Sequence, residues 1–274
     1  MSLPDFQRRV CRLVADARRA SGEGYVAGGV ALNELIAAAR VSEDIDLFHD
    51  TEQAVAALWD ADRAALERAG LDVAVARERP GYVEAVVSRE ADHVLVQWTR
   101  DSAFRFFPLV EHADFGLTLH PFDLATNKVL ALVGRVEIRD WVDLLACHAA
   151  VQPLGYLAWA AAGKDPGFSP AAILEEAGRA NRYAPGEVAT LQFDGPPPNP
   201  ADLSRGWHAA LTEGRAIVDR LPADEVGTCV LAPDGSLLRA GLDDLARAVA
   251  SRDVRFHRGR IRGAFPDVRI GPRT

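Results

Sequence analysis

The first part of the chain alternates between helical and extended patterns of apolar residues. Between residues 6 and 17, apolar positions recur at intervals of three and four with arginines between them, which predicts an amphipathic helix. A short β-prone stretch at 25–26 then runs into Gly28 and Gly29 and a helix-forming segment at 31–40. We therefore expect a strand, a glycine turn and a helix in direct succession.

A second strand and helix follow at 44–48 and 52–68, where charged and apolar residues first alternate and then take a helical spacing. Three further β-like runs lie at 71–76, 82–88 and 93–99. A Pro-Gly pair marks the turn between the first two of these runs. These elements predict an N-terminal α/β domain, residues 1–120, with a mixed sheet flanked by helices.

From residue 121 onward the helical spacing predominates. Helices are predicted at 122–135, 139–151, 171–180 and 204–221. The proline-rich stretch 194–202 predicts a loop, and 228–241 predicts a hairpin around an Asp-Gly turn, followed by a short helix and a basic tail. The sequence thus predicts an α+β chain whose second domain, 121–274, is mainly helical with a terminal hairpin and a basic tail.

Composition narrows the class of protein. The 274 residues are 49% hydrophobic, enough for two packed units, and the formal charge of −8 argues against non-specific coating of nucleic acid. The three cysteines are too far apart for a disulfide framework or a paired zinc site. No apolar run approaches the roughly 18 residues of a membrane span, and the N-terminus lacks the apolar core of a secretion signal. We therefore expect a cytoplasmic protein without membrane association.

The candidate chemistry begins with two aspartates. Asp44 and Asp46 stand two apart on a predicted strand, so their side chains project from one face, about 6.6 Å apart at the backbone. Clustered carboxylates are what phosphoryl transfer needs to hold divalent ions. Upstream, Gly28 and Gly29 precede a helix, where glycines let backbone amides approach phosphate oxygens. The two features together predict a site for a metal-bound phosphate.

These residues resemble a known family. GGVAL followed by RVSEDIDLF is similar to the G-G/S … S-x-D-x-D signature of the polymerase-β-like nucleotidyltransferases. The later segment FDLATNKVLALVGRVEIRDWVDLL resembles the lysine and R-D-x-x-D-L motifs of AbiEii-type nucleotidyltransferases, which include toxins that modify tRNA. The resemblance covers residues 20–150, whereas 151–274 match only loosely. It implies the nucleotidyltransferase fold for the N-terminal domain.

The resemblance also implies roles for individual residues. Gly28, Gly29 and Ser42 would contact the triphosphate of an NTP, and Asp44 and Asp46 would bind Mg²⁺. Lys128 would bind phosphate, and Asp140 would complete the motif of the helical segment. The implied reaction transfers a nucleoside monophosphate to an acceptor hydroxyl and releases pyrophosphate. The implied partners are tRNA or another RNA and a cognate antitoxin protein.

One position departs from the superfamily pattern. Many members place a third carboxylate on a later strand, where this chain has Gln97. A neutral amide is a poorer ligand for a second Mg²⁺ than a carboxylate is. A catalytically silent protein that keeps the fold as a binding module is therefore a second interpretation of the chain.

The acceptor and the helical motif are each open to more than one interpretation as well. A small-molecule acceptor, as in aminoglycoside-modifying relatives, would suit the acidic composition. Lys128 is also open to the default interpretation of a lysine, a surface residue of a helix. Arg139 and Asp140 are also open to interpretation as a structural ion pair.

The end of the chain is basic. Residues 251–274 hold seven arginines against two aspartates, a local charge of +5 in a chain of −8. The arginines are Arg252, Arg255, Arg258, Arg260, Arg262, Arg269 and Arg273. A solvated tail and a contact with the RNA backbone are both open interpretations.

Overall fold

The computed structural model describes residues 3–179 and 185–267, which form two compact units. The first unit comprises residues 3–103, 109–124 and 192–196. The second comprises 104–108, 197–267 and the described part of 125–191. The division is not a single cut in the sequence, because two five-residue segments, 104–108 and 192–196, each belong to the unit that their flanking residues do not.

A seven-stranded mixed sheet forms the first unit, in the order β3-β4-β5-β2-β1-β8-β7. Its strands are β1 (Tyr25–Ala27), β2 (Asp44–His49), β3 (Asp72–Arg79), β4 (Tyr82–Arg89), β5 (Asp92–Arg100), β7 (Val110–His112) and β8 (Gly116–Thr118). The pairs β2–β5 and β1–β8 are parallel, and the others are antiparallel. The five strands predicted from the sequence are confirmed, and β7 and β8, only three residues each, were not predicted.

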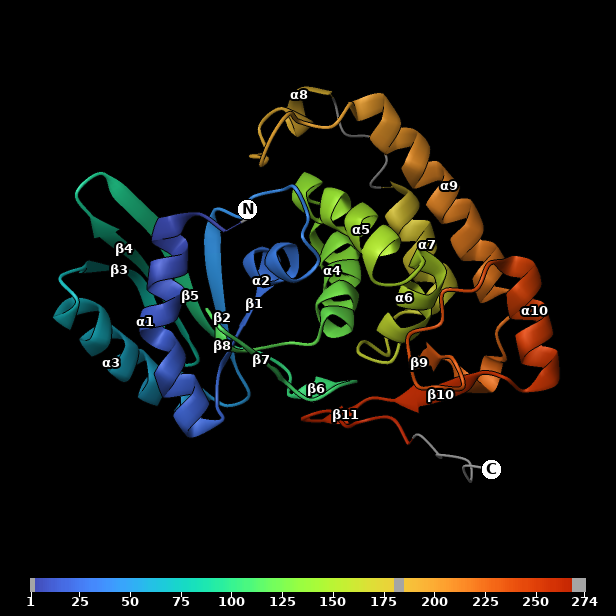
Figure 1. Ribbon diagram of the computed structural model, residues 1–274, viewed down its shortest axis with the longest axis horizontal. Coiled ribbons are helices and arrows are strands. Elements are labelled where there is room, and N and C mark those ends of the chain that lie inside the picture. The colour runs from blue at the N-terminus through green and yellow to red at the C-terminus, as the bar shows by residue number, and fades with distance from the viewer. Residues whose placement is uncertain (1–2, 180–184, 268–274) are drawn as a thin grey trace. The chain divides into compact units, whose positions relative to one another are not determined.

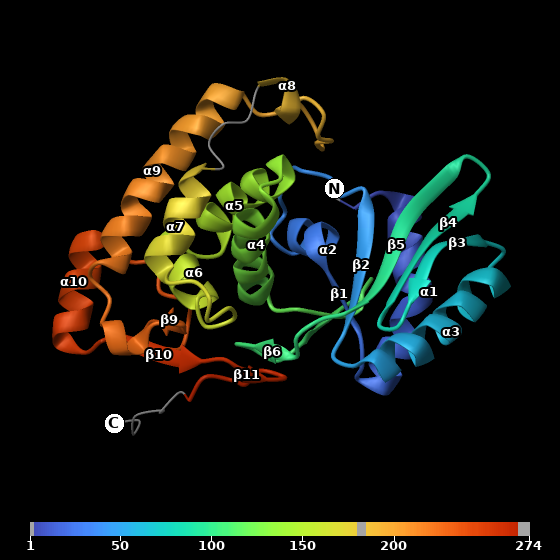
Figure 2. The same cartoon turned by 180° about the vertical axis from the view of Figure 1, so that it is seen from behind.

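Three helices accompany this sheet, α1 (Asp5–Ser21), α2 (Gly28–Leu35) and α3 (Glu52–Arg68). Figures 1 and 2, which view the chain from opposite sides, both show α1 and α3 side by side along the sheet. The predicted bounds of α3 are confirmed, and Thr51 caps it by accepting a hydrogen bond from the Ala54 amide at 3.1 Å. Helix α2 ends before the predicted residue 40, because Ala37 takes a positive φ of 52°.

The alternation along the strands gives the sheet two different faces. Leu47 of β2 is paired with Trp98 of β5, and the Trp98 ring lies edge-on against Trp59 of α3, with ring centroids 4.7 Å apart. These buried residues define the face that packs on the helices. Asp44 and Asp46 are an odd number of residues from Leu47, so their side chains lie on the opposite face.

A buried ion pair links α1, α3 and β5. Arg18 and Asp62 are both fully buried, and two guanidinium nitrogens of Arg18 donate to the two Asp62 oxygens at 2.7 and 3.2 Å. The indole Nε1 of Trp98 donates to Asp62 as well, at 2.7 Å. Each charge is thus compensated in a place that water does not reach.

The second unit is mainly helical, as predicted. Its helices are α4 (Pro121–Arg135, whose first turn belongs to the first unit), α5 (Ile138–Ala150), α6 (Leu154–Ala161), α7 (Pro170–Arg179), α8 (Pro185–Val188), α9 (Pro200–Val218) and α10 (Leu242–Ser251). Helix α6 was not predicted, because it is apolar all round and fully buried and so shows no helical periodicity. Within the described residues, no single helix is long and apolar enough to cross a membrane, and α5 with α6 would qualify only as a pair bent by 112°.

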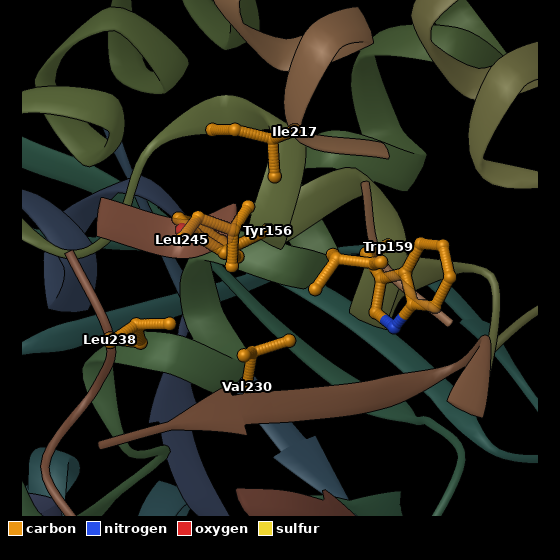
Figure 3. Packing of buried hydrophobic residues seen from close by; sticks show 7 residues of the cluster. Tyr156, Trp159, Ile217, Val230, Leu238 and Leu245 are labelled. Carbon is orange, nitrogen blue, oxygen red and sulfur yellow. The ribbon is translucent and has the colours of Figure 1, made fainter. Parts of the chain in front are cut away.

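The core of the second unit gathers around α6. Figure 3 shows the buried cluster, whose members are Tyr156, Trp159, Ile217, Leu221, Val230, Leu238 and Leu245. Helices α6 and α9 touch backbone to backbone, since a Cβ placed on Gly155 would lie 2.6 Å from the Gly214 carbonyl oxygen. A second close approach, between Gly163 and Gly227, leaves no room for a side chain either.

The C-terminal part differs from its prediction. The Asp-Gly turn is present, but the predicted second hairpin strand is reduced to a single bridge between Leu231 and Leu237. Strand β9 (Thr228–Leu231) is fully buried and pairs instead with β10 (Arg255–Arg258), whose Phe256 packs against the core cluster. The prediction of a basic tail is therefore wrong for the residues up to Ile261, which include the strands β10 and β11. Arg269 and Arg273 lie outside the described residues.

A two-stranded sheet completes the second unit. Strand β6 (Phe104–Arg105) pairs with β11 (Arg260–Ile261).

Helix α9 begins at Pro200, inside the stretch predicted as a loop, because Asn199 caps it and proline is well suited to the first helical turn.

The buried ion pair generates the first prediction. Replacing Asp62 with alanine leaves the Arg18 guanidinium buried without its counter-charge, so we expect the free energy of unfolding to fall by about 3–5 kcal/mol. Urea denaturation followed by far-ultraviolet circular dichroism measures this. The control is Glu67→Ala, which removes the exposed pair between Arg63 and Glu67 of the same helix and should cost less than about 0.5 kcal/mol. Equal effects of the two substitutions would contradict the prediction.

Candidate functional site

The acidic pair lies on the face of the sheet that the helices α1 and α3 leave uncovered. Asp44 and Asp46 are half-buried and alternate with the fully buried Ile45 and Leu47. Their side chains therefore share one face, as the spacing predicts. Burial of the neighbouring apolar residues fixes the strand, so the two carboxylates have a defined position.

The double glycine lies against this pair. Gly28 has a φ of +64°, and a Cβ on it would overlap the carboxylate of Asp46. A Cβ on Gly29 would lie 2.5 Å from Arg40 Nη2 and 2.7 Å from Ser42 Oγ. The glycines do more than permit a turn, because each leaves the space that a polar side chain of the site fills.

Ser42 orients the first aspartate. Its hydroxyl donates a hydrogen bond to Asp44 Oδ1 at 2.9 Å, and its main-chain oxygen accepts one from Gln7 Nε2 at 2.8 Å. Ser42 is itself buried. The contact between Ser42 and a triphosphate, implied by the family resemblance, stays a prediction.

Arg40 is a site residue that the sequence interpretation missed. It is 5% exposed and lies beside Gly29, with its Nη1 donating to the Val41 carbonyl oxygen at 3.1 Å. The signal was available, because the arginine opens the RVSEDIDLF segment two residues before the serine. Its guanidinium places a fixed positive charge near the glycine turn.

Gln97 stands directly beside Asp46 in the sheet. The register pairs Asp46 with Gln97 on β5, and Gln97 with Glu84 on β4, so all three side chains are on one face. Gln97 Nε2 donates to Glu84 Oε2 at 3.2 Å, and the Tyr82 hydroxyl donates to the same oxygen at 2.7 Å. Partial burial raises the pKa of Tyr82 and its hydrogen bond to Glu84 raises it further, so the phenol stays a donor at neutral pH.

The donor set can be tested for a metal. No group of three or more His, Cys, Asp or Glu side chains that could hold a metal ion occurs among residues 3–179 and 185–267. The carboxylates of Asp44 and Asp46 are hard oxygen donors, and Mg²⁺ is commonly held by one or two carboxylates together with water and substrate phosphates. The pair fits such an ion, and it does not fit an all-protein cage.

Lys128 and Asp140 form a separate cluster in the second unit. The Lys128 ammonium lies 2.8 Å from Asp140 Oδ1 and 3.0 Å from Asp143 Oδ2, and all three side chains are buried. Arg135 donates to both Asp140 oxygens, at 2.7 and 3.0 Å. Arg139, which the sequence suggested as the partner of Asp140, pairs with Glu137 at 2.6 Å. The role of Lys128 in phosphate binding stays a prediction.

The charges of this cluster decide the ionisation of Asp140. Burial alone would raise the pKa of its carboxyl, but the hydrogen bond from Arg135 and the charge of Lys128 outweigh burial. The pKa of Asp140 is therefore held below its usual range. The ionised form stabilises the join between α4 and α5.

Comparison with known proteins gives three results. The model of the family described as nucleotidyl transferase AbiEii toxin, type IV toxin–antitoxin system, matches residues 17–213. A search of curated protein sequences gives no significant match. Among solved structures, JHP933 from Helicobacter pylori is 13% identical with a TM-score of 0.55, over 80% of this chain and 95% of that one.

A second solved structure is similar at a lower score. MenT4, a nucleotidyltransferase toxin from Mycobacterium tuberculosis, is 14% identical with a TM-score of 0.48, over 79% of this chain and 83% of that one. At these identities, the likeness to JHP933 concerns the fold alone.

The lowered pKa of Asp140 generates the second prediction. The pKa of Asp140 is lower in the folded chain than in the unfolded chain, where it is about 3.9, so ionisation of Asp140 stabilises the folded chain above about pH 3.9. This stabilisation is lost as the pH falls through the pKa of Asp140 in the folded chain. We expect Asp140→Asn to lower the free energy of unfolding by about 3 kcal/mol at pH 7. The difference from wild type should shrink as the pH falls below about 4. Urea denaturation at a series of pH values measures it, and a difference independent of pH would contradict the prediction.

Proposed function

The chain belongs to the AbiEii family of nucleotidyltransferase toxins, and we propose that its reaction is Mg²⁺-dependent transfer of a nucleoside monophosphate from an NTP to a hydroxyl of an RNA, with release of pyrophosphate. The observation that carries this proposal is the packing of the Asp46 carboxylate directly on the backbone of Gly28. That contact joins the predicted metal ligand to the predicted phosphate-binding turn. Metal binding and phosphate binding would therefore take place side by side.

Each side chain has a defined part in this reaction. Asp44 and Asp46 would hold the divalent ion, which supplies charge neutralisation for the phosphates and activates the attacking hydroxyl. Ser42 keeps the Asp44 carboxylate in one orientation by its hydrogen bond. The amides at the start of α2, where Gly28 and Gly29 have no side chains, would bind phosphate oxygens with the favourable end of the helix dipole. Fixed groups of this kind lower the barrier because they need no reorganisation.

The acceptor is proposed to be RNA on the basis of charge. Arg258, Arg260 and Arg262 are exposed along β10, β11 and the turn that follows. A groove of about 350 Å³ in the same unit is lined by residues of 255–260 and by Phe265, which is 79% exposed. Cationic side chains beside an exposed aromatic ring are the elements of single-stranded RNA binding. The family description also supports a cognate antitoxin protein as a partner.

The third prediction tests the acidic pair. Asp46→Asn should reduce transfer by at least about 100-fold, because it removes charge stabilisation that acts in the transition state. The protein should remain folded, since Asp46 lies outside the buried core. The assay incubates the protein with each labelled NTP, Mg²⁺ and total RNA, with and without excess chelator.

The control for this assay is Asp72→Asn, an exposed carboxylate at the start of β3 in the same sheet, which should transfer as wild type does. Undiminished transfer by Asp46→Asn, or transfer in excess chelator, would contradict the metal site. Absence of transfer from wild type with every NTP would favour the catalytically silent interpretation.

The fourth prediction tests the RNA acceptor. Replacing Arg258, Arg260 and Arg262 together with alanine should weaken RNA binding and flatten its dependence on salt, by about one unit of slope for each lost phosphate contact. Binding of NTP should not change, because these arginines lie outside the predicted nucleotide-binding residues Gly28, Gly29, Ser42 and Lys128. Fluorescence anisotropy with labelled RNA at several salt concentrations measures both quantities.

A matched triple variant controls for net charge. Arg205, Arg220 and Arg247 are also exposed arginines of the second unit, away from the groove. Replacing these three arginines with alanine should change the salt dependence of RNA binding less than replacing Arg258, Arg260 and Arg262 does. Equal slopes for wild type and the variant of Arg258, Arg260 and Arg262 would instead favour a small-molecule acceptor.

A further inference from the structure

A chain of hydrogen bonds runs across the sheet toward the acidic pair. Tyr82 donates to Glu84, and Gln97 donates to the same Glu84 oxygen, at 2.7 and 3.2 Å. The next residue in this cross-strand row is Asp46. The hydrogen bonds therefore link Tyr82, Glu84 and Gln97, and strand register places Gln97 beside Asp46, a predicted metal ligand on β2.

The chemistry of Glu84 decides which way the Gln97 amide is turned. The Glu84 oxygen already accepts a hydrogen bond from Tyr82, and a carboxylate oxygen accepts rather than donates, so the Gln97 atom that faces it is the nitrogen. The two branches of an amide point in different directions from the same carbon. Strand β5 lies between β4 and β2 in the sheet. Because the Gln97 amide nitrogen faces Glu84 on β4, we expect the amide oxygen to face Asp46 on β2.

We propose that Glu84 is a positioning residue, which holds the Gln97 amide so that its Oε1 is a neutral third oxygen ligand beside Asp44 and Asp46. The inference rests on the proposed Mg²⁺-dependent function of this site. Amide oxygens are accepted ligands of hard cations, and Mg²⁺ or Mn²⁺ binds through them without needing a third negative charge. Partners that orient a ligand in this way contribute strongly to metal affinity.

The arrangement explains why a glutamine stands where the superfamily pattern has a carboxylate. A glutamate at position 97 would face Glu84 at the distance that now holds a hydrogen bond. Two carboxylates in contact repel each other. With Glu84 present, the amide is the group that combines an oxygen toward Asp46 with a donor toward Glu84.

The fifth prediction measures metal binding without catalysis. Glu84→Ala releases the amide, and we expect the dissociation constant for Mn²⁺ alone to rise about 10-fold, as found when an orienting partner of a ligand is removed. Electron paramagnetic resonance of free Mn²⁺ gives that constant. In the ¹⁵N–¹H spectrum, the Gln97 side-chain amide, assigned with Gln97→Glu, should be broadened by Mn²⁺ in wild type and less so in Glu84→Ala.

The control is Ser88→Ala, on the same strand and the same face as Glu84 but outside the hydrogen-bonded row. It should bind Mn²⁺ as wild type does. A reversed pair provides a second test, because Gln97→Glu together with Glu84→Gln keeps both side-chain lengths and restores the hydrogen bond with donor and acceptor exchanged. This double variant should bind Mn²⁺ more tightly than wild type, whereas Gln97→Glu alone should bind it less tightly than the double variant.

Two outcomes would overturn the proposal. One is wild-type Mn²⁺ affinity and amide broadening in folded Glu84→Ala. The other is equal Mn²⁺ affinity of Gln97→Glu with and without Glu84→Gln. Neither touches the proposed nucleotidyl transfer, which depends on Asp44 and Asp46 and is tested by the Asp46→Asn assay, so the two hypotheses fail separately.

Discussion

The absence of a side chain at Gly28 is the constraint on which the candidate site depends. The Asp46 carboxylate fills the space that a Cβ would take, and the positive φ of Gly28 starts α2 immediately after β1. Pairing of β1 with β2 places Ala27 opposite Asp46 and so sets this contact. The proposed phosphate site and the proposed metal site would thus both lie on this one strand pair, which buried residues on the other face of the sheet hold in place.

Most elements of the fold follow from sequence periodicity, and the misses have physical reasons. The bounds of α3 are recovered because its apolar spacing, its Thr51 cap and its arginine end agree. Helix α6 has no polar face to give a period. Strand β10 is read as a tail because it has the sequence Arg-Phe-His-Arg, which shows no alternation of apolar and polar residues. Short strands such as β7 and β8 have too few residues to show alternation.

The sequence predicted those parts of the candidate site that lie in recognisable motifs, the Gly28–Gly29 turn and the acidic pair. Asp44, Asp46 and Ser42 lie within five residues, and their chemistry suggests their grouping. Glu84 comes to Gln97 only through the register of two strands, which spacing along the chain does not encode. The pairing of Arg135 with Asp140 was missed for another reason. Arg135 extends across the break between α4 and α5 to reach Asp140, whereas the adjacent Arg139 pairs with Glu137.

The glycine contacts in the second unit bear on how mutational scans of this protein are interpreted. At Gly155 and at Gly163, the backbone of another segment occupies the place of a side chain. Even alanine would force apart segments whose packing buries Tyr156 and Trp159. Variants at these glycines would therefore score among the most damaging in a library although neither residue belongs to the acidic site. In a protein whose activity is toxic to its host, selection for survival would enrich such substitutions, and the enriched positions would map the close helix contacts as well as the chemistry.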